Sequence, residues 1–212
     1  MILVAIASEL EYRQLPSFED DTVHSAVVGV GKAASAAATT RLIQELSPKL
    51  VVSAGIGGYL GLRLRIGDIA VVVDDFLADE GVYGPGGFFH FDTLGFMQCR
   101  WQTSLSTAGI PLPVEPFRVE FCRGATVSST TGCQDLARKR YGDWDGGVCE
   151  SMEGAAIAQA CAAAGVPWIG VRAISNYLED RDMSRWDIPI AMESLGSYLP
   201  QCLAFFQASQ CR

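Results

Sequence analysis

The sequence has few residues of the kinds that bind metal ions. His24 and His90 are its only histidines in 212 residues, and none of its seven cysteines form a Cys-x-x-Cys pair. Zinc sites need clusters of such ligands at short spacing, so no metal is expected. An odd number of unclustered cysteines also favours reduced thiols and a cytoplasmic location over a disulfide framework.

Basic residues and long hydrophobic runs are also scarce. The 16 lysines and arginines stand against 24 acids, which gives a formal net charge of −8. Nucleic acids and anionic membranes are therefore disfavoured as partners, because both are bound through excess positive charge. No apolar run reaches the ~18 residues needed to cross a bilayer. The start, MILVAIASELEYR, resembles a first strand rather than a signal peptide. These absences favour a small molecule as the ligand.

Apolar runs of strand length alternate with helical patterns along the chain. Strands are expected at 2–7, 24–30, 50–58, 68–78, 117–129 and 167–176, and helices at 31–46, 153–164 and about 189–207. A loop-rich insertion is expected over 79–116, and no linker, repeat or low-complexity tract divides the chain. Continuous apolar strands indicate a sheet covered on both faces, so we expect one α/β domain over residues 1–212.

Ligands bind beyond the carboxyl ends of the strands in such sheets. The polar segments that follow the expected strands or begin the next helix are 8–11, 29–32, 55–58, 128–131, 150–153 and 175–176. Side chains that are far apart in the sequence would meet at this edge of the sheet, which makes these segments the candidate site.

Two glycine-containing segments each allow two interpretations. GVGK at 29–32 invites comparison with a phosphate cradle, but it lacks the GxxxxGK[ST] spacing, and a tight strand-to-helix turn explains it more simply. In AGIGG at 54–58, the glycines either let a ligand approach the backbone or only permit a turn.

Four polar residues are ambiguous when each is taken alone. Glu153 heads an expected helix, where an acid complements the helix dipole. Glu11 follows the first strand and is also explained as an exposed acid at the start of a loop or helix. Asn176 is compatible with a plain turn. Arg172, inside an apolar strand, is harder to dismiss, because an internal arginine requires an acidic partner.

Two further groups of residues have less specific patterns. Phe88, Phe89 and Phe91 form either the core of the insertion or a lid over an apolar ligand. Acidic residues cluster in runs that indicate mainly a solvated surface, namely 19–21, 74–75 and 178–182.

Several motifs, taken together and in order, resemble the nucleoside phosphorylase and nucleosidase superfamily. They are GVGKAASAAATT at 29–40, SAGIGG at 53–58, RIGDIAVV at 65–72 and ESMEGAAIAQACAAAGVPWIGVRAISN at 150–176. Within the superfamily, the ending ISNYLEDRDMSRWDIPIAMESLG at 174–196 and the insertion LADEG…FDTLGF resemble the futalosine hydrolases. The resemblance covers nearly the whole chain and implies a mixed sheet flanked by helices.

The resemblance implies a role for each polar group. Glu153 would accept hydrogen bonds from the ribose 2′- and 3′-hydroxyls, with Met152 packed against the sugar. Glu11, helped by Arg172, would activate the attacking water, and Asn176 would hold the leaving purine at N7. Carboxylates suit this chemistry, because N-glycoside cleavage passes through an oxocarbenium-like sugar. The remaining substrate-binding residues that the resemblance implies are Gly55, Ile56, Gly57, Ser129, Thr130 and Thr131.

Two residues indicate which reaction of the superfamily to expect. Asn176 offers a donor and an acceptor, so it serves both O6 and N7 of hypoxanthine, where adenine-cleaving relatives carry aspartate. Glu11 would repel phosphate, and AGIGGYLG at 54–61 contains no arginine to hold it, so water is the expected nucleophile. We therefore expect hydrolysis of futalosine to hypoxanthine and dehypoxanthine futalosine, in menaquinone biosynthesis. The expected enzyme is a cytoplasmic homo-oligomer, a dimer or tetramer, without metal or organic cofactor.

Three alternatives stay open: a methylthioadenosine/S-adenosylhomocysteine nucleosidase, a purine nucleoside phosphorylase, and a non-catalytic nucleoside-binding protein. Two positions depart from the family pattern. Ile56 stands where many relatives have serine. Ser151 stands where adenine-specific enzymes have glutamate, with Glu150 one place earlier. The apolar insertion at 79–116 is the candidate site for the aromatic carboxylate arm of the substrate.

Overall fold

The computed structural model describes residues 1–18, 21–142 and 146–210. Glu19 and Asp20 of the first acidic run, and Cys211, lie outside the described residues. The strands are β1 (Ile2–Ile6), β2 (Val23–Val27), β3 (Leu50–Leu60), β4 (Ile69–Leu77), β5 (Gly81–Gly84), β6 (Gly87–His90), β7 (Arg100–Gln102), β8 (Val119–Thr126), β9 (Val148–Ser151) and β10 (Trp168–Tyr177). The helices are α1 (Glu9–Tyr12), α2 (Lys32–Leu46), α3 (Gln134–Tyr141), α4 (Gly154–Ala164) and α5 (Ile188–Gln210), with a 3-10 turn at Met183–Arg185.

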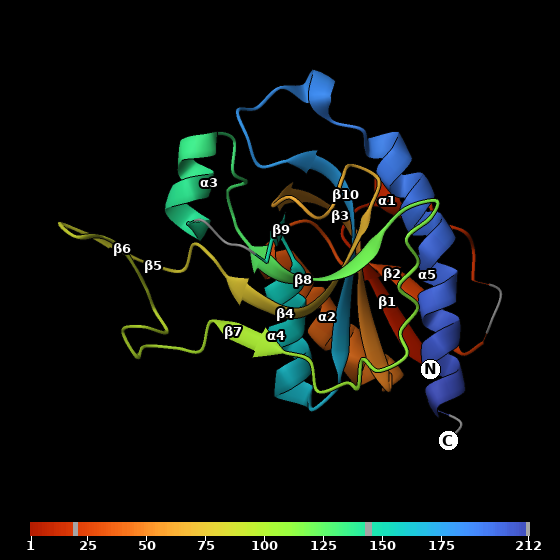
Figure 1. The fold of residues 1–212 in the computed structure, drawn as a ribbon. Coiled ribbons are helices and arrows are strands. Elements are labelled where there is room, and N and C mark those ends of the chain that lie inside the picture. The colour runs from red at the N-terminus through yellow and green to blue at the C-terminus, as the bar shows by residue number, and fades with distance from the viewer. Residues whose placement is uncertain (19–20, 143–145, 211–212) are drawn as a thin grey trace.

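The main sheet is mixed and closes on itself in part (Figure 1). Its strand order is β10-β4-β8-β9-β3-β1-β2, with β7 on β4, and β10 also pairs with β3. β3, β10, β4, β8 and β9 therefore form a ring, from which β1 and β2 extend in parallel. Within the ring, β10–β4 and β3–β9 are antiparallel pairs. The predicted mixed α/β sheet is confirmed.

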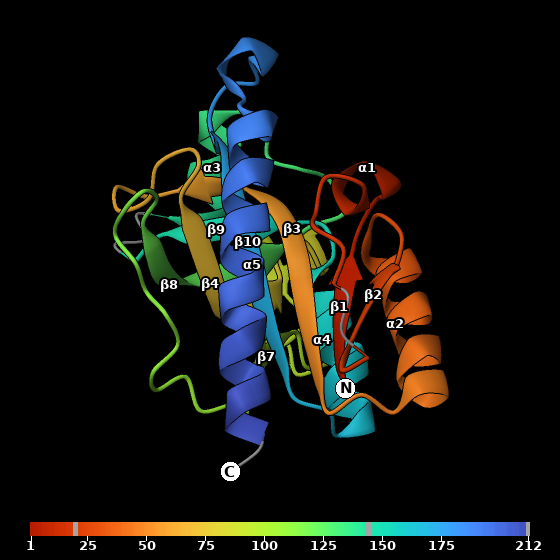
Figure 2. The ribbon, with the colours of Figure 1, turned by 90° about the vertical axis from the view of Figure 1, so that its right-hand side faces the viewer.

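Helices cover the sheet on both faces, and α5 lies across β10 and β3 in Figure 2. Alternate side chains of a strand point to opposite faces. Accordingly, Ile2, Val4 and Ile6 of β1 pack in the cluster that contains the buried residues of α5. Leu3 and Ala5 pack in the cluster that contains buried residues of α2 and α4. Among the described helices, none is both long and apolar enough to cross a membrane.

Most predicted elements are present within a few residues of their expected bounds, but three differences matter. The strand expected to end at its glycines continues to Leu60. The segment 79–116, expected as loop, contains β5, β6 and β7, and the β5–β6 hairpin projects from the body of the molecule (Figure 1). The sequence pattern does not predict α1, α3 or β9. β9 has only four residues, and α3 (QDLARKRY) has no apolar stripe of helical period.

The expectation that the acids at 74–75 face solvent is wrong. Asp75 is only 3% exposed, and Asp74 pairs with Arg100 and with Arg123. The physical reason is the position of this end of β4, which pairs with β7 on one side and with β8 on the other. A side chain at this end of β4 therefore meets protein on its inner face.

Candidate active site

The site begins where β3 changes its neighbour. β1 pairs with β3 only as far as Ala54, and β9 pairs with it only from Gly58 onward. Residues 55–57 consequently have no strand partner on that edge. A buried main-chain N–H requires an acceptor, and the N–H of Ile56 donates to the Glu11 carboxylate at 3.1 Å. The gap in the sheet thus receives a side chain where a strand would otherwise lie.

Glu11 is the third residue of α1, and local contacts hold its carboxylate. Ser8, the N-cap of α1, accepts from the Glu11 N–H at 3.3 Å and donates its hydroxyl to Glu11 Oε2 at 2.7 Å. A Cβ at Gly55 would lie 2.9 Å from Glu11 Oε1, so glycine leaves room for the carboxylate there. The spacing Ser-x-x-Glu is that of a capping box, a sequence signal that points to this contact. Glu11 therefore begins a helix and also faces the site.

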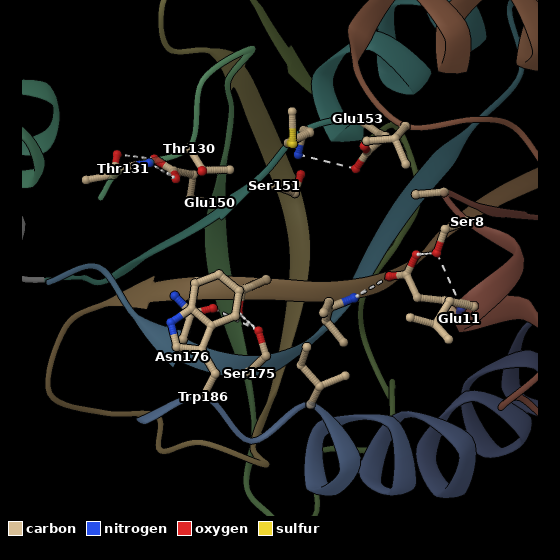
Figure 3. A pocket seen from close by; sticks show the side chains of 18 of the residues that line it. Ser8, Glu11, Thr130, Thr131, Glu150, Ser151, Glu153, Ser175, Asn176 and Trp186 are labelled. Carbon is tan, nitrogen blue, oxygen red and sulfur yellow. Dashed lines mark hydrogen bonds between the residues drawn. The ribbon is translucent and has the colours of Figure 1, made fainter. Parts of the chain in front are cut away.

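A cavity of about 270 Å³ opens beside the gap (Figure 3). Glu11 and Ser8 lie on one side of it, Asn176 and Trp186 on the opposite side, and Glu153 on a third. Its walls come from the carboxyl ends of β1, β8, β9 and β10 and from the glycines of β3, as the strand-end rule predicts. The predicted site residues that line this cavity are Glu11, Ile56, Gly57, Thr130, Thr131, Met152, Glu153 and Asn176.

Three predicted residues lie elsewhere. Gly55 and Arg172 line a smaller adjoining cavity, which the main cavity's Glu11, Ile56 and Glu153 also line. Ser129 lines neither cavity. It is exposed, and its carbonyl oxygen accepts from Arg140 Nη1 at 2.7 Å. The structure therefore does not bring Ser129 into the cavity with the other predicted residues, and its role toward a ligand stays a prediction.

Arg172 is 4% exposed, and in the part of the chain that the structure describes no carboxylate is its hydrogen-bond partner. Its guanidinium donates to the carbonyl oxygen of Ser53 and, at 2.7 Å, to the Ser53 hydroxyl. The expectation that an acidic side chain directly bonds to Arg172 is therefore wrong. Its positive charge nevertheless acts through space, and lowers the pKa of both Glu153 and Asp75.

Glu153 occupies the N-cap position of α4 but points toward the cavity. Oε1 accepts from the Gly31 N–H at 2.8 Å, and Oε2 accepts from the Met152 N–H at 3.2 Å. Burial raises the pKa of Glu153, while the Gly31 N–H and Arg172 lower it. Gly31 has a positive φ of 89°, which favours glycine. The GVGK turn therefore presents an amide to Glu153.

Asn176 is 7% exposed and faces Glu11 from across the cavity. Its Oδ1 accepts from Ser175 Oγ at 2.9 Å, and its Nδ2 donates to the Tyr177 carbonyl at 3.1 Å. A carboxamide has two N–H donors and two acceptor lone pairs. One donor and one acceptor position therefore remain for a ligand.

Glu150 also lines the cavity, but protein groups surround its oxygens. Thr131 donates to it twice, from the main-chain N–H at 2.7 Å and from the hydroxyl. Tyr141 donates its hydroxyl at 2.6 Å, and Arg140 lies 3.7 Å away. Glu150 thus ties the loop after β8 to α3.

The sequence analysis assigns no role to Trp186, which lines the cavity beside Asn176. The Arg181 guanidinium lies 5.3 Å from the centre of its ring, within cation–π distance. An isolated aromatic residue in a polar run, DRDMSRWD, is the signal that could have found it. Conversely, none of the described residues that line the cavity belongs to 79–116. The proposed substrate-arm site in that insertion is thus not part of the cavity within one chain.

Comparisons with known proteins show the family of the chain. The model of the Phosphorylase superfamily matches residues 14–204. The chain belongs to the Phosphorylase superfamily. Within the superfamily, it is 35% identical over 208 residues to a futalosine hydrolase of Acidothermus cellulolyticus, which covers 90% of this chain and 82% of that protein. It is 26% identical over 199 residues to a 5′-methylthioadenosine/S-adenosylhomocysteine nucleosidase of Chromohalobacter salexigens, which covers 84% of this chain and 82% of that protein.

A solved structure shows the superfamily fold in full. The native structure of futalosine hydrolase of Helicobacter pylori strain 26695 matches with a TM-score of 0.78 and covers 96% of this chain and 97% of that one. The two sequences are 17% identical, so this likeness concerns the fold.

Proposed function

We propose that this protein is a nucleosidase that hydrolyses the N-glycosidic bond of futalosine, an activity of menaquinone biosynthesis. The products are hypoxanthine and dehypoxanthine futalosine. One observation carries the proposal: Glu11, Glu153 and Asn176 face a single cavity from three sides. The 35% identity to a futalosine hydrolase supports the choice of substrate.

Glu11 is the proposed base. Water between Glu11 and the sugar would give a proton to the carboxylate while its oxygen bonds to C1′. The bond from C1′ to the purine nitrogen breaks, the electron pair leaves with the purine, and the purine takes up a proton at N7 from solvent. Glu11 then releases the proton it took from water to solvent, so the net reaction consumes one water. Arg172 would offset the repulsion between Glu11 and Glu153, since its charge lowers the pKa of Glu153 whereas Glu11 raises it.

Glu153 is the proposed ribose ligand. Each of its oxygens accepts one main-chain N–H, which leaves lone pairs for the 2′- and 3′-hydroxyls. Its negative charge would also stabilise the oxocarbenium-like sugar in the transition state. Met152 lines the cavity next to it and would pack against the sugar. The open edge of β3 at 55–57 would lie along the substrate.

Asn176 is the proposed purine ligand. Its remaining donor would bond to O6 of hypoxanthine, and its remaining acceptor would take the hydrogen bond from N7–H of the departing base. Adenine protonated at N7 would instead present two donors, its 6-amino group and N7–H, and would leave the Asn176 donor unpaired. Thr130 and Thr131 line the cavity and would border the base.

We also propose that the protein is a homo-oligomer, a dimer or tetramer. Tyr83 and Phe96, in the segment that contains the projecting hairpin, are 80% and 74% exposed (Figure 1). Large exposed aromatic side chains are typical of interfaces. Light scattering would give a mass of at least twice that of one chain, and a monomer would contradict the proposal.

The alternative that a specific observation favours is a methylthioadenosine/S-adenosylhomocysteine nucleosidase, because a relative of that name is 26% identical. Such an enzyme would use the same Glu11 and Glu153 but release adenine. The base that leaves therefore separates the two functions.

The test is chromatographic detection of free base. The purified protein is given futalosine, inosine and methylthioadenosine in parallel, with and without phosphate. Hypoxanthine from futalosine alone, at a rate that phosphate does not change, is the expected result. Adenine from methylthioadenosine would support the alternative, a phosphate requirement would overturn the role of Glu11, and no base from any substrate would indicate a binding protein.

A matched pair of variants controls the assay. Glu11→Gln is expected to abolish base release. Glu9→Gln removes an acid two residues earlier in α1, where Glu9 is exposed, pairs with Arg13 and does not line the cavity. It is expected to leave the rate unchanged.

A further inference from the structure

The N-terminus of α4 lacks the usual cap. An N-cap side chain normally accepts a hydrogen bond from an amide of the first turn. Glu153 is in this position but makes no such bond, since its carboxylate accepts from Gly31 and Met152 instead. The first amides of α4 must therefore find their acceptors elsewhere.

The last residues of β8 and β9 supply these acceptors. The Gly154 N–H donates to Ser151 Oγ at 3.4 Å, and the Ala155 N–H donates to Thr126 Oγ1 at 2.7 Å. Thr126 is at the end of β8 and is fully buried. The better of the two bonds therefore comes from a residue 29 positions away in the sequence.

Asp75 fixes the direction of the Thr126 hydroxyl. Thr126 donates its one proton to Asp75 Oδ1 at 2.9 Å, which leaves its oxygen lone pairs for the Ala155 N–H. A Cβ at Gly124 or at Gly154 would overlap the Asp75 carboxylate. Glycine at both positions thus lets this carboxylate lie against the start of α4.

We propose that Asp75 and Thr126 are positioning residues that cap α4 in place of Glu153, so that Glu153 stays available to the ribose hydroxyls. Neither residue lines the main cavity or the adjoining one. Without the Thr126 hydroxyl, the Ala155 N–H would lose its acceptor, and Glu153 holds the N-cap position from which a side chain normally replaces it. Its carboxylate would then turn to the amides of its own helix and leave the Gly31 N–H. The ribose part of this inference rests on the proposed function.

The test compares Thr126→Val, which has nearly the same shape but no hydroxyl, with Thr126→Ser, which keeps the hydroxyl. The readout is the ratio of kcat/KM for futalosine over 2′-deoxyfutalosine, or for the matching methylthioadenosine pair if the enzyme releases adenine. Thr126→Val is expected to lower this ratio about tenfold, as loss of a hydrogen bond to a charged group does. For Thr126→Ser, this ratio is expected to stay within about twofold of the wild-type value, because serine keeps the same hydrogen bond.

A merely structural role gives a different result. Thr126→Val would then lower kcat/KM by the same factor on both substrates, which would overturn the proposal. If Thr126→Val does not fold, Asp75→Asn takes its place, because it keeps the volume but replaces an acceptor oxygen by an NH₂ donor. A severalfold lower ratio is expected for Asp75→Asn, and an unchanged ratio would remove Asp75 from the pair.

A crystal structure of Thr126→Val tests the inference independently of turnover. Glu153 is expected to accept from the Ala155 N–H and to have left Gly31. A Glu153 carboxylate still bonded to Gly31 would overturn the proposal, even if the unchanged protein cleaved no nucleoside. Failure of the proposed function and failure of the capping pair are therefore separate results.

Discussion

Glu150 and Glu153 are three residues apart, line the same cavity and are both buried, at 4% and 8% exposure. Thr131 and Tyr141 donate three hydrogen bonds to Glu150, with a guanidinium nearby. Among the described residues, the donors to Glu153 are two main-chain amides, those of Gly31 and Met152. A buried carboxylate whose lone pairs are used by the protein holds a loop and a helix together. One with unused lone pairs is free to bind a ligand. Burial alone does not separate the two cases, but the count of donors does.

Between these two acids, the larger expected effect is the loss of turnover in Glu153→Gln. The amide of this variant places an NH₂ donor against the ribose hydroxyls, which themselves donate to Glu153. We therefore expect kcat/KM to fall about 1,000-fold, equivalent to about 4 kcal/mol. The free energy of unfolding at pH 8 should be unchanged or higher, since burial raises the pKa of Glu153 and the amide avoids the cost of ionisation. Steady-state kinetics and urea unfolding measure the two quantities. Near-normal turnover would show that Glu153 does not bind the substrate.

A third buried acid, Asp75, extends the comparison, because its contribution to stability depends on pH. Burial raises its pKa from 3.8 to about 7, against the opposing charge of Arg172, with Asp74 adding to the rise. The unfolded chain loses this proton near pH 4 and the folded protein near pH 7, so the stability linked to Asp75 falls as pH rises between these values. Between pH 4 and pH 7, the unfolding free energy of Asp75→Asn should rise by on the order of 3 kcal/mol relative to that of wild type. Urea unfolding across this range measures the gain, and parallel pH curves for the two proteins would contradict it.

The smallest expected effect is from Glu150→Gln, and it is on stability. The amide keeps one acceptor oxygen but weakens the bonds from Thr131 and Tyr141, so we expect a loss of about 1–2 kcal/mol in unfolding free energy. Turnover should change by less than about fivefold, because three of the four lone-pair sites of Glu150, including both on Oε2, already accept hydrogen bonds from the protein. The comparison would fail if Glu150→Gln lost turnover as strongly as Glu153→Gln while keeping its stability.

The main strands and helices were predictable from the sequence because their signals are local, whereas the strand order was not. The apolar runs of β1, β3, β4 and β10 and the small residues of α2 and α4 indicate their own structure and a sheet covered on both faces. β9 and α3 lack such signals: one is too short, and the other is mostly polar. Both are held by contacts distant in sequence: β9 pairs with β3, and the Gln134 N–H at the start of α3 donates to Asp180.

The candidate site was predictable at its strand ends but not in its supporting contacts. Glu11, Glu153 and Asn176 follow strands or begin helices, so the strand-end rule brings them to one edge. The burial of Asp75 was not predictable, because it depends on Thr126 and on glycines far away in the sequence. The same holds for the bond of Arg172 to Ser53, which joins two neighbouring strands.

The most direct test of the account is a crystal structure of the protein with 9-deazainosine, whose C–C glycosidic bond water cannot cleave. The account predicts that both ribose hydroxyls lie within about 3.2 Å of the Glu153 oxygens, while Glu150 keeps its bonds to Thr131 and Tyr141. Ribose hydroxyls bound to Glu150 instead, or an analogue bound outside the cavity, would contradict it.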